Sequence, residues 1–304
     1  TNTLPRDKGG SIPENMLETT EEFLEDCDRL IQLYHDPKPY SMSQIVPSPC
    51  QPINCYPETF RETVDLARKR GVRMHTHLGE GENEIMLARH GKRTLDWCRD
   101  IGFYGPDVWI AHGWELTDEE YTQLGRDGIG ISHCPTPAIL GGFPILPMQK
   151  LMEKNVCVSI GCDGSATNDG SSMLDAMRTA WMMQAFYSKQ RGGCISPYEM
   201  LKMATVNGAR TLGRSDLGCL EPEKGADLFF VDTTQLELTG ALHDPKNLLP
   251  RAGVTGPVKL TMINGRVVWQ DGRFPGVDEA QLAAEGEAVC TRVLRTPCEA
   301  FHSL

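Results

Sequence analysis

The sequence lacks a long apolar run and has no excess of basic residues. No stretch approaches the roughly 18 consecutive apolar residues that a membrane-spanning helix requires. Acidic residues outnumber basic ones, 41 to 30, and the formal net charge is -11. That balance argues against nucleic-acid or anionic-membrane binding, which needs a basic patch. We therefore expect a small, neutral or weakly charged substrate.

Paired cysteines are also missing, and we expect no signal peptide. The 11 cysteines are scattered singly without a C-x-x-C motif, which is typical of reduced thiols rather than of a disulfide framework or a zinc ribbon. The first residues carry no apolar segment of the kind found in signal peptides. These features predict a cytoplasmic protein.

Helical and strand-like segments alternate along most of the chain, which predicts a large α/β domain with a small β appendage. An Asn264-Gly265 pair predicts a hairpin turn in the appendage. The predicted strands are 44–46, 72–77, 107–111, 128–132, 156–162, 225–232 and 258–268. The predicted helices are 16–34, 57–70, 82–90, 93–101, 148–154, 173–189, 196–212 and 278–292, and a further helix is predicted to begin at residue 117. Residues 136–147 are predicted to form a long apolar loop.

Residues 74–80, MHTHLGE, form the end of one predicted strand and the turn after it. Alternation along a strand places His75 and His77 on one face, and Glu80 falls in the following loop, where α/β barrels carry catalytic groups. This pattern predicts a metal site with a general base beside it. The alternative is two strand histidines with ordinary partners and a solvated glutamate.

Three later strands also end in polar side chains, namely His112, His133 and Asp163. Imidazole and carboxylate together suit zinc or iron, which lowers the pKa of bound water to about 7. Asp163 can bind the ion and take a proton from water, and Glu80 can carry a proton to a ring nitrogen. This set of imidazole and carboxylate groups favours hydrolytic attack on the carbon of a C=N or C(=O)N group. A capping role for His112 or Asp163 remains the alternative.

Four motifs resemble the amidohydrolase superfamily. They lie at 75–80, 111–113, 132–135 and 163–169. The likeness is to the branch of zinc-dependent aminohydrolases that contains guanine, 8-oxoguanine and S-adenosylhomocysteine deaminases and the triazine hydrolases, and 8-oxoguanine deaminase-like proteins are the most similar. The resemblance implies a TIM-type (β/α)8 barrel with a small β-sandwich, a Zn²⁺ or Fe²⁺ ion, and a homodimer.

The resemblance also assigns roles to individual residues. His77 would be the metal ligand of the fifth strand, and Glu80 would be the proton shuttle to the substrate ring. His112 would polarise water or substrate from the sixth strand, and Asp163 would be ligand and base at the eighth. The substrate-binding residues implied are Glu80, His133 and Asn168.

One family feature is absent. The first barrel strand of the family supplies an H-x-H ligand pair, and no such pair precedes His75. We therefore predict an incomplete barrel, strands four to eight, within residues 1–215, a sandwich segment at 216–275, and a helix and tail at 276–304. A rival interpretation takes His75 and His77 as the pair, with His112 and Asp163 completing the ligand set.

The expected function is metal-dependent hydrolytic deamination of a purine-like heterocycle such as 8-oxoguanine, with release of ammonia. Gly79, where many relatives have alanine, and the Thr136-Pro137-Ala138 run, where they have a Ser-Ser-Asn or Glu-Ser-Asn run, indicate that the substrate can differ. Two alternatives stay open: a triazine chlorohydrolase or aminohydrolase, and a truncated, inactive fragment that serves as a binding piece.

Overall fold

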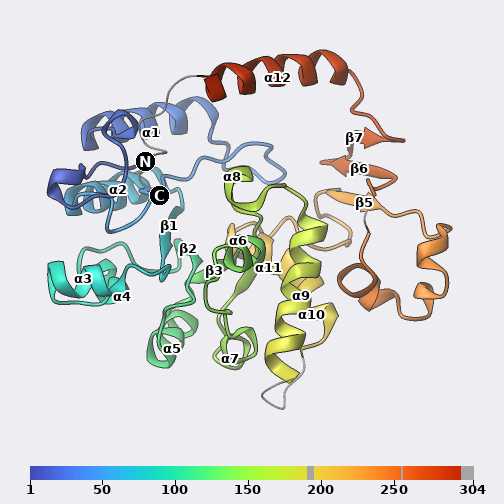
Figure 1. Ribbon diagram of the computed structural model, residues 1–304, viewed down its shortest axis with the longest axis horizontal. Coiled ribbons are helices and arrows are strands. Elements are labelled where there is room, and N and C mark those ends of the chain that lie inside the picture. Colours follow the sequence, from blue (N-terminus) through green and yellow to red (C-terminus); the bar gives the residue numbers. More distant parts are fainter. Residues whose placement is uncertain (190–194, 255, 296–304) are drawn as a thin grey trace.

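A computed structural model describes residues 1–189, 195–254 and 256–295. The chain forms an α/β structure with two sheets (Figure 1). The first is parallel and four-stranded, in the order β1-β2-β3-β4, and the second is antiparallel and three-stranded, in the order β5-β6-β7. The strands are β1 (Met74–Leu78), β2 (Val108–His112), β3 (Gly130–His133), β4 (Val158–Ile160), β5 (Leu228–Phe230), β6 (Leu260–Ile263) and β7 (Arg266–Gln270).

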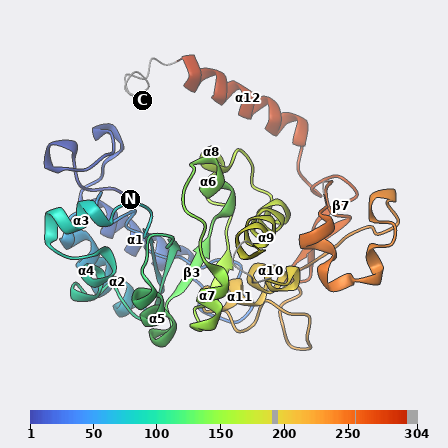
Figure 2. The same cartoon turned by 60° about the horizontal axis from the view of Figure 1, so that its bottom comes forward.

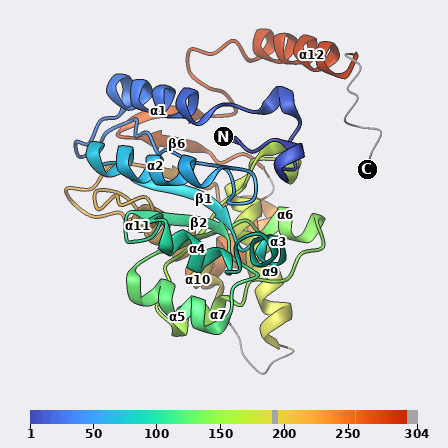
Figure 3. The same cartoon turned by 90° about the vertical axis from the view of Figure 1, so that its left-hand side faces the viewer.

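Helices connect the strands of the parallel sheet, as a βαβ topology requires. The antiparallel sheet lies on the opposite side of the molecule from α3 and α4 (Figure 2), and α12 lies apart from the parallel sheet (Figures 1 and 3). The α-helices are α1 (Thr20–Tyr34), α2 (Pro57–Arg70), α3 (Asn83–His90), α4 (Thr94–Asp100), α5 (Asp118–Asp127), α6 (Pro135–Leu140), α7 (Met148–Glu153), α8 (Ser165–Asn168), α9 (Met173–Lys189), α10 (Pro197–Ala204), α11 (Val206–Thr211) and α12 (Glu279–Arg295).

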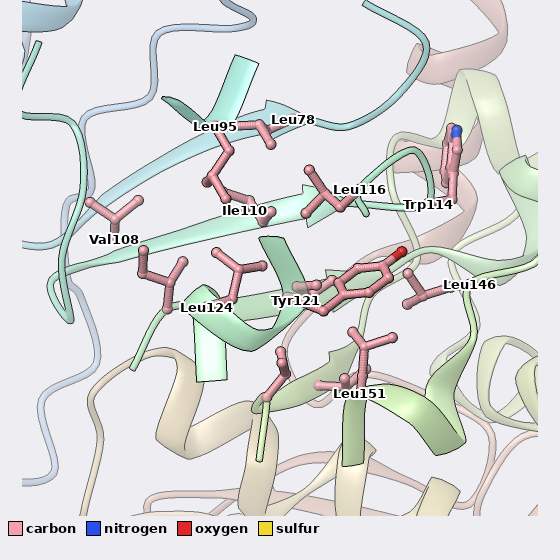
Figure 4. Close-up of a cluster of buried hydrophobic side chains, with 14 of the residues drawn as sticks. Leu78, Leu95, Val108, Ile110, Trp114, Leu116, Tyr121, Leu124, Leu146 and Leu151 are labelled. Carbon is pink, nitrogen blue, oxygen red and sulfur yellow. The ribbon is translucent and has the colours of Figure 1, made fainter. Parts of the chain in front are cut away.

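The main core lies between the parallel sheet and its helices. Ile110 of β2 packs near Leu124 and Tyr121 of α5 (Figure 4). The Tyr121 hydroxyl donates a hydrogen bond to the carbonyl oxygen of Gly113 at 2.9 Å, so its polar end is satisfied inside the core. Because β2 is buried along its whole length, this packing holds its carboxyl end in place.

Several predicted elements are confirmed. Helix α2 has its predicted bounds, with a proline in the first turn and a left-handed Gly71 that ends it. Helix α9 also spans its predicted 173–189. The predicted hairpin joins β6 to β7, with positive φ of 46° at Asn264 and 75° at Gly265, as a type I′ turn requires.

The strand predicted at 44–46 is wrong. Pro47 and Pro49 follow it, and proline lacks the N–H group that a ladder needs. This segment reaches β1 only by separate bonds, in which the amides of His75 and His77 donate to the carbonyl oxygens of Pro47 at 3.2 Å and Cys50 at 3.0 Å. The parallel sheet therefore has four strands where five were predicted.

Three helical predictions also need correction. The helix predicted from residue 16 begins at Thr20, because Thr19 and Glu22 form a reciprocal capping box. The helix predicted over 196–212 is broken at Thr205, which has non-helical φ and ψ of -124° and -92°. The predicted loop 136–147 contains most of α6.

The four methionines of α9 differ in burial. Met177 and Met183 are buried and contribute to the core, whereas Met173 and Met182 are exposed. Among the described residues, no helix combines the length and apolar character needed to cross a membrane. The predicted domain boundaries stay a prediction.

Candidate active site

The carboxyl ends of the parallel strands bring the predicted polar side chains together. The ring of His77 stacks on that of His112, with centroids 5.3 Å apart. The Nε2 atom of His112 lies 3.3 Å from Glu80 Oε1 and 3.9 Å from Asp163 Oδ2. The ends of β1, β2 and β4 thus contribute to one cluster, as expected for a parallel sheet whose carboxyl ends share an edge.

Two members of this cluster have an unusual backbone. His112 and Asp163 adopt left-handed conformations, with φ of 72° and 65°. Such conformations are costly for residues with a Cβ atom, by about 1–3 kcal/mol each, and they concentrate at functional sites. The strand-end position of both residues was predicted, but this strain was not.

His77 is oriented by its neighbour Cys50. The Nδ1 atom of His77 lies 2.8 Å from the Cys50 carbonyl oxygen, so Nδ1 carries a proton and Nε2 is the nitrogen that can bind a metal ion. Burial by itself lowers the pKa of His77, but hydrogen bonds with Cys50 and the charge of Glu80 raise it to about 9. Metal-binding histidines commonly donate their second N–H to a backbone carbonyl in this way, and a bound ion replaces the proton on the other nitrogen.

His112 and His133 are buried, and among the described residues neither ring nitrogen of either side chain has a hydrogen-bond partner. Burial and neighbouring imidazoles lower the pKa of His112 to about 4 and that of His133 to about 3, so both rings are neutral. An unsatisfied buried polar atom costs about 1–3 kcal/mol. Four such atoms in two residues at the ends of the neighbouring strands β2 and β3 indicate that the site is built for a ligand.

One metal-holding group occurs among the described residues, and it consists of His112, Cys134 and Asp163. Their ligand atoms all lie within 4.8 Å of one another. Nitrogen, sulfur and carboxylate oxygen are donors that zinc accepts. His77 is outside this group, so the metal role predicted for His77 and Asp163 stays a prediction.

The rival ligand pair of His75 and His77, whose ring centroids lie 5.7 Å apart, stays a prediction. The His75 ring stacks on Trp109 with centroids 5.0 Å apart, and its Nδ1 lies 3.2 Å from the Trp109 carbonyl oxygen. The Nδ1 atom of His75 is therefore engaged with β2.

Glu80 is half-buried in the loop after β1. Burial is the largest cause that raises its pKa, and the charges of Glu82 and Asp163 add to the rise. The side chain of Gln51 donates a hydrogen bond to Glu80 Oε2. The contact with Gln51 was missed because the two residues are far apart in sequence and no spacing rule links them.

Gly79 lets two loops approach each other closely. Its φ is +71°, and a Cβ atom there would lie 3.0 Å from the Gly113 Cα atom. The Gly79 found in place of a more usual alanine therefore fits a local contact between the loops that follow β1 and β2.

Asn168 lies in α8, close to the end of β4. Its Nδ2 atom donates a hydrogen bond to the Cys162 carbonyl oxygen at 2.5 Å. The side-chain NH2 group of Asn168 therefore stabilises the loop that carries Asp163. The substrate contacts predicted for Asn168 and for the fully buried His133 remain predictions.

Comparisons with known proteins find relatives over most of the chain. A family model described as the amidohydrolase family matches residues 8–268. The chain is 46% identical to hydroxydechloroatrazine ethylaminohydrolase of Pseudomonas sp. strain ADP, over 96% of this chain and 61% of that protein. It is 35% identical to 8-oxoguanine deaminase of Pseudomonas aeruginosa, over 96% of this chain and 65% of that protein.

A solved structure is also similar. The zinc complex of atrazine chlorohydrolase from Arthrobacter aurescens superimposes with a TM-score of 0.89 at 28% identity, covering 94% of this chain and 63% of that one. The present chain thus spans 61% to 65% of the length of these three relatives.

Proposed function

This chain belongs to the amidohydrolase family, and we propose that it forms the reacting part of an enzyme that hydrolytically displaces an amine from a ring carbon of a nitrogen heterocycle. The observation that carries the proposal is the placement of two carboxylates, Glu80 and Asp163, at 3.3 Å and 3.9 Å from Nε2 of His112. One carboxyl group can give a proton while the other takes one, which is the requirement for adding water to a C=N bond.

The relatives favour a substrate with a carbon–nitrogen bond to be broken. The relative at 46% identity is named for removal of an ethylamino group from a hydroxylated triazine, and the one at 35% is named for deamination of 8-oxoguanine. The chlorohydrolase is less similar, at 28%. We therefore place hydroxylated alkylamino-triazines first and amino-purines such as 8-oxoguanine second.

Zinc fits the cluster. Asp163 and the Nε2 atom of His77 would hold it, and the unpartnered Nε2 of His112 lies beside them. When bound, the ion supplies positive charge that lowers the pKa of water to about 7. The zinc-bound structure of a relative at a TM-score of 0.89 supports this assignment.

The residues of this chain then move protons in two stages. As the water oxygen bonds to the ring carbon, Asp163 accepts a water proton and Glu80 gives its own proton to the adjacent ring nitrogen. Next, the exocyclic nitrogen takes the proton from Asp163 and leaves as an amine with the electron pair of the broken C–N bond. The remaining hydroxyl proton returns to Glu80 as the C=O bond forms. The raised pKa of Glu80 suits it to start in the acid form.

We also infer that the parallel sheet is part of a TIM-type (β/α)8 barrel, which the likeness to the solved relative supports. The antiparallel sheet would then belong to a β-sandwich. A homodimer and a cytoplasmic location are further proposals that rest on the family resemblance.

Amine release by the purified, zinc-supplemented chain tests the proposed function. We expect ethylamine or ammonia from a hydroxylated alkylamino-triazine or from 8-oxoguanine, and a loss of at least about 100-fold in kcat for Glu80→Gln. Glu84→Gln, at an exposed position of α3, is the matched control and should keep full activity. Equal release by Glu80→Gln, or no release from either substrate class, would overturn the proposal.

A further inference from the structure

The loop that presents Glu80 has little regular structure of its own. It runs from Gly79 to Glu82, and its two glycines have φ of +71° and +110°. These backbone conformations are not stabilised by a helix or a sheet ladder, so other groups must fix the direction of the Glu80 side chain.

Glu82 supplies such a group. Its Oε1 accepts a hydrogen bond from the Gly79 amide and its Oε2 accepts one from the Glu80 amide, both at 2.6 Å. The residue is only 2% exposed. Two short bonds from consecutive amides to one buried carboxylate are charge-assisted and are stronger than bonds between neutral groups.

The side chain of Glu82 also turns away from its own helix. Glu82 occupies the N-cap position of α3, yet it makes no side-chain hydrogen bond to the amides of that helix. The residues that ordinarily cap the first turn from this position are Ser, Thr, Asp and Asn. Here both oxygens face the preceding loop, so helix capping does not account for the residue.

Glu115 holds the other half of the loop from the neighbouring strand end. Its Oε2 accepts hydrogen bonds from the Gly81 amide at 3.1 Å and the Asn83 amide at 3.2 Å. Its own amide donates to the Gly79 carbonyl oxygen at 3.0 Å. The two carboxylates therefore divide these backbone amides between them, and of the two only Glu82 accepts a bond from the amide of Glu80.

We propose that Glu82 is a positioning residue, whose buried carboxylate fixes the backbone of Gly79 and Glu80 so that the Glu80 side chain faces His112. The catalytic part of this inference rests on the proposed function, because it takes Glu80 as the proton carrier. The structural part does not depend on any activity.

Hydrogen exchange of single backbone amides in the full chain tests the structural part. In Glu82→Gln, a side-chain NH2 group replaces one carboxylate oxygen and faces a backbone N–H, with which it cannot form a hydrogen bond. Protection of the Gly79 and Glu80 backbone amides against hydrogen exchange should therefore fall by about 10-fold. In Glu115→Gln, the Gly81 and Asn83 amides should lose protection while those of Gly79 and Glu80 keep it. Unchanged protection at Gly79 and Glu80 in a folded Glu82→Gln chain would overturn the proposal.

Kinetics of a double-mutant cycle test the catalytic part. Glu82→Gln should lower kcat by about 10-fold, with KM changed by less than about 2-fold. In a chain that already carries Glu80→Gln, the second substitution should not lower kcat further. Equal losses in both backgrounds would mean that Glu82 does not act through Glu80. Should Glu82→Gln fail to fold, Glu82→Asp keeps the charge at shorter reach, and the same two amides should show a smaller loss.

If the wild-type chain releases no amine, the proposed function fails, but the exchange experiment still decides whether Glu82 fixes the loop. If amine is released and the exchange pattern is unchanged, only the positioning role fails.

Discussion

The two sheets of this protein differ in how completely they are covered. In the parallel sheet Ile131 is 0% exposed, whereas Phe230 in the antiparallel sheet is 56% exposed. Helices pack on the parallel strands, and buried strands of this type are continuously apolar. The candidate active site therefore stands on the better buried sheet, and we expect the antiparallel sheet to contribute less to the free energy of unfolding.

The largest loss of stability should come from a cavity in the parallel sheet. Ile131→Ala removes a fully buried side chain from β3, so it should lower the free energy of unfolding by about 2–5 kcal/mol. Denaturant unfolding followed by tryptophan fluorescence measures this loss. A loss below about 1 kcal/mol would contradict the central place given to this sheet.

A smaller effect is expected from Gly79→Ala, at the junction of two loops. The left-handed φ and the 3.0 Å approach to Gly113 should lower the free energy of unfolding by about 1–2 kcal/mol. The kcat should fall as well, because the loop carries Glu80. Gly142→Ala is the control, since it has a similar φ of +67° and open space around it; equal effects would show that the contact with Gly113 is unimportant.

The smallest loss of stability should come from a substitution in the antiparallel sheet. Phe230→Ala removes a larger side chain than Ile131→Ala does, but its half-exposed position on β5 should limit the loss to about 1 kcal/mol. The same denaturant experiment applies. A loss as large as that of Ile131→Ala would mean that the two sheets contribute equally to stability.

The sequence was sufficient to predict which side chains would meet at the strand ends. His77 and His112 lie at the carboxyl ends of β1 and β2, and Asp163 follows β4. Because the carboxyl ends of parallel strands share one edge, their convergence follows from topology. Long helices with clear end signals, such as α2 and α9, were predicted with their full bounds.

Contacts made by loop backbones could not be predicted. The bonds from Glu82 to the amides of Gly79 and Glu80 depend on positive φ values that no periodicity reports. The non-helical backbone of Thr205 likewise has no periodic signal, and the strand predicted at 44–46 failed because the prolines that follow it cannot donate to a ladder. The sequence thus indicates which residues are available, but not what holds them in place.

The metal content of the purified chain, measured by elemental analysis, tests most directly whether the ends of the parallel strands form a metal-dependent hydrolytic site. We predict about one zinc ion per chain, lost in His77→Ala and in Asp163→Ala and retained in His75→Ala, whose ring is packed on Trp109. A folded wild-type chain that binds no zinc, or a His77→Ala variant that keeps it, would contradict the account.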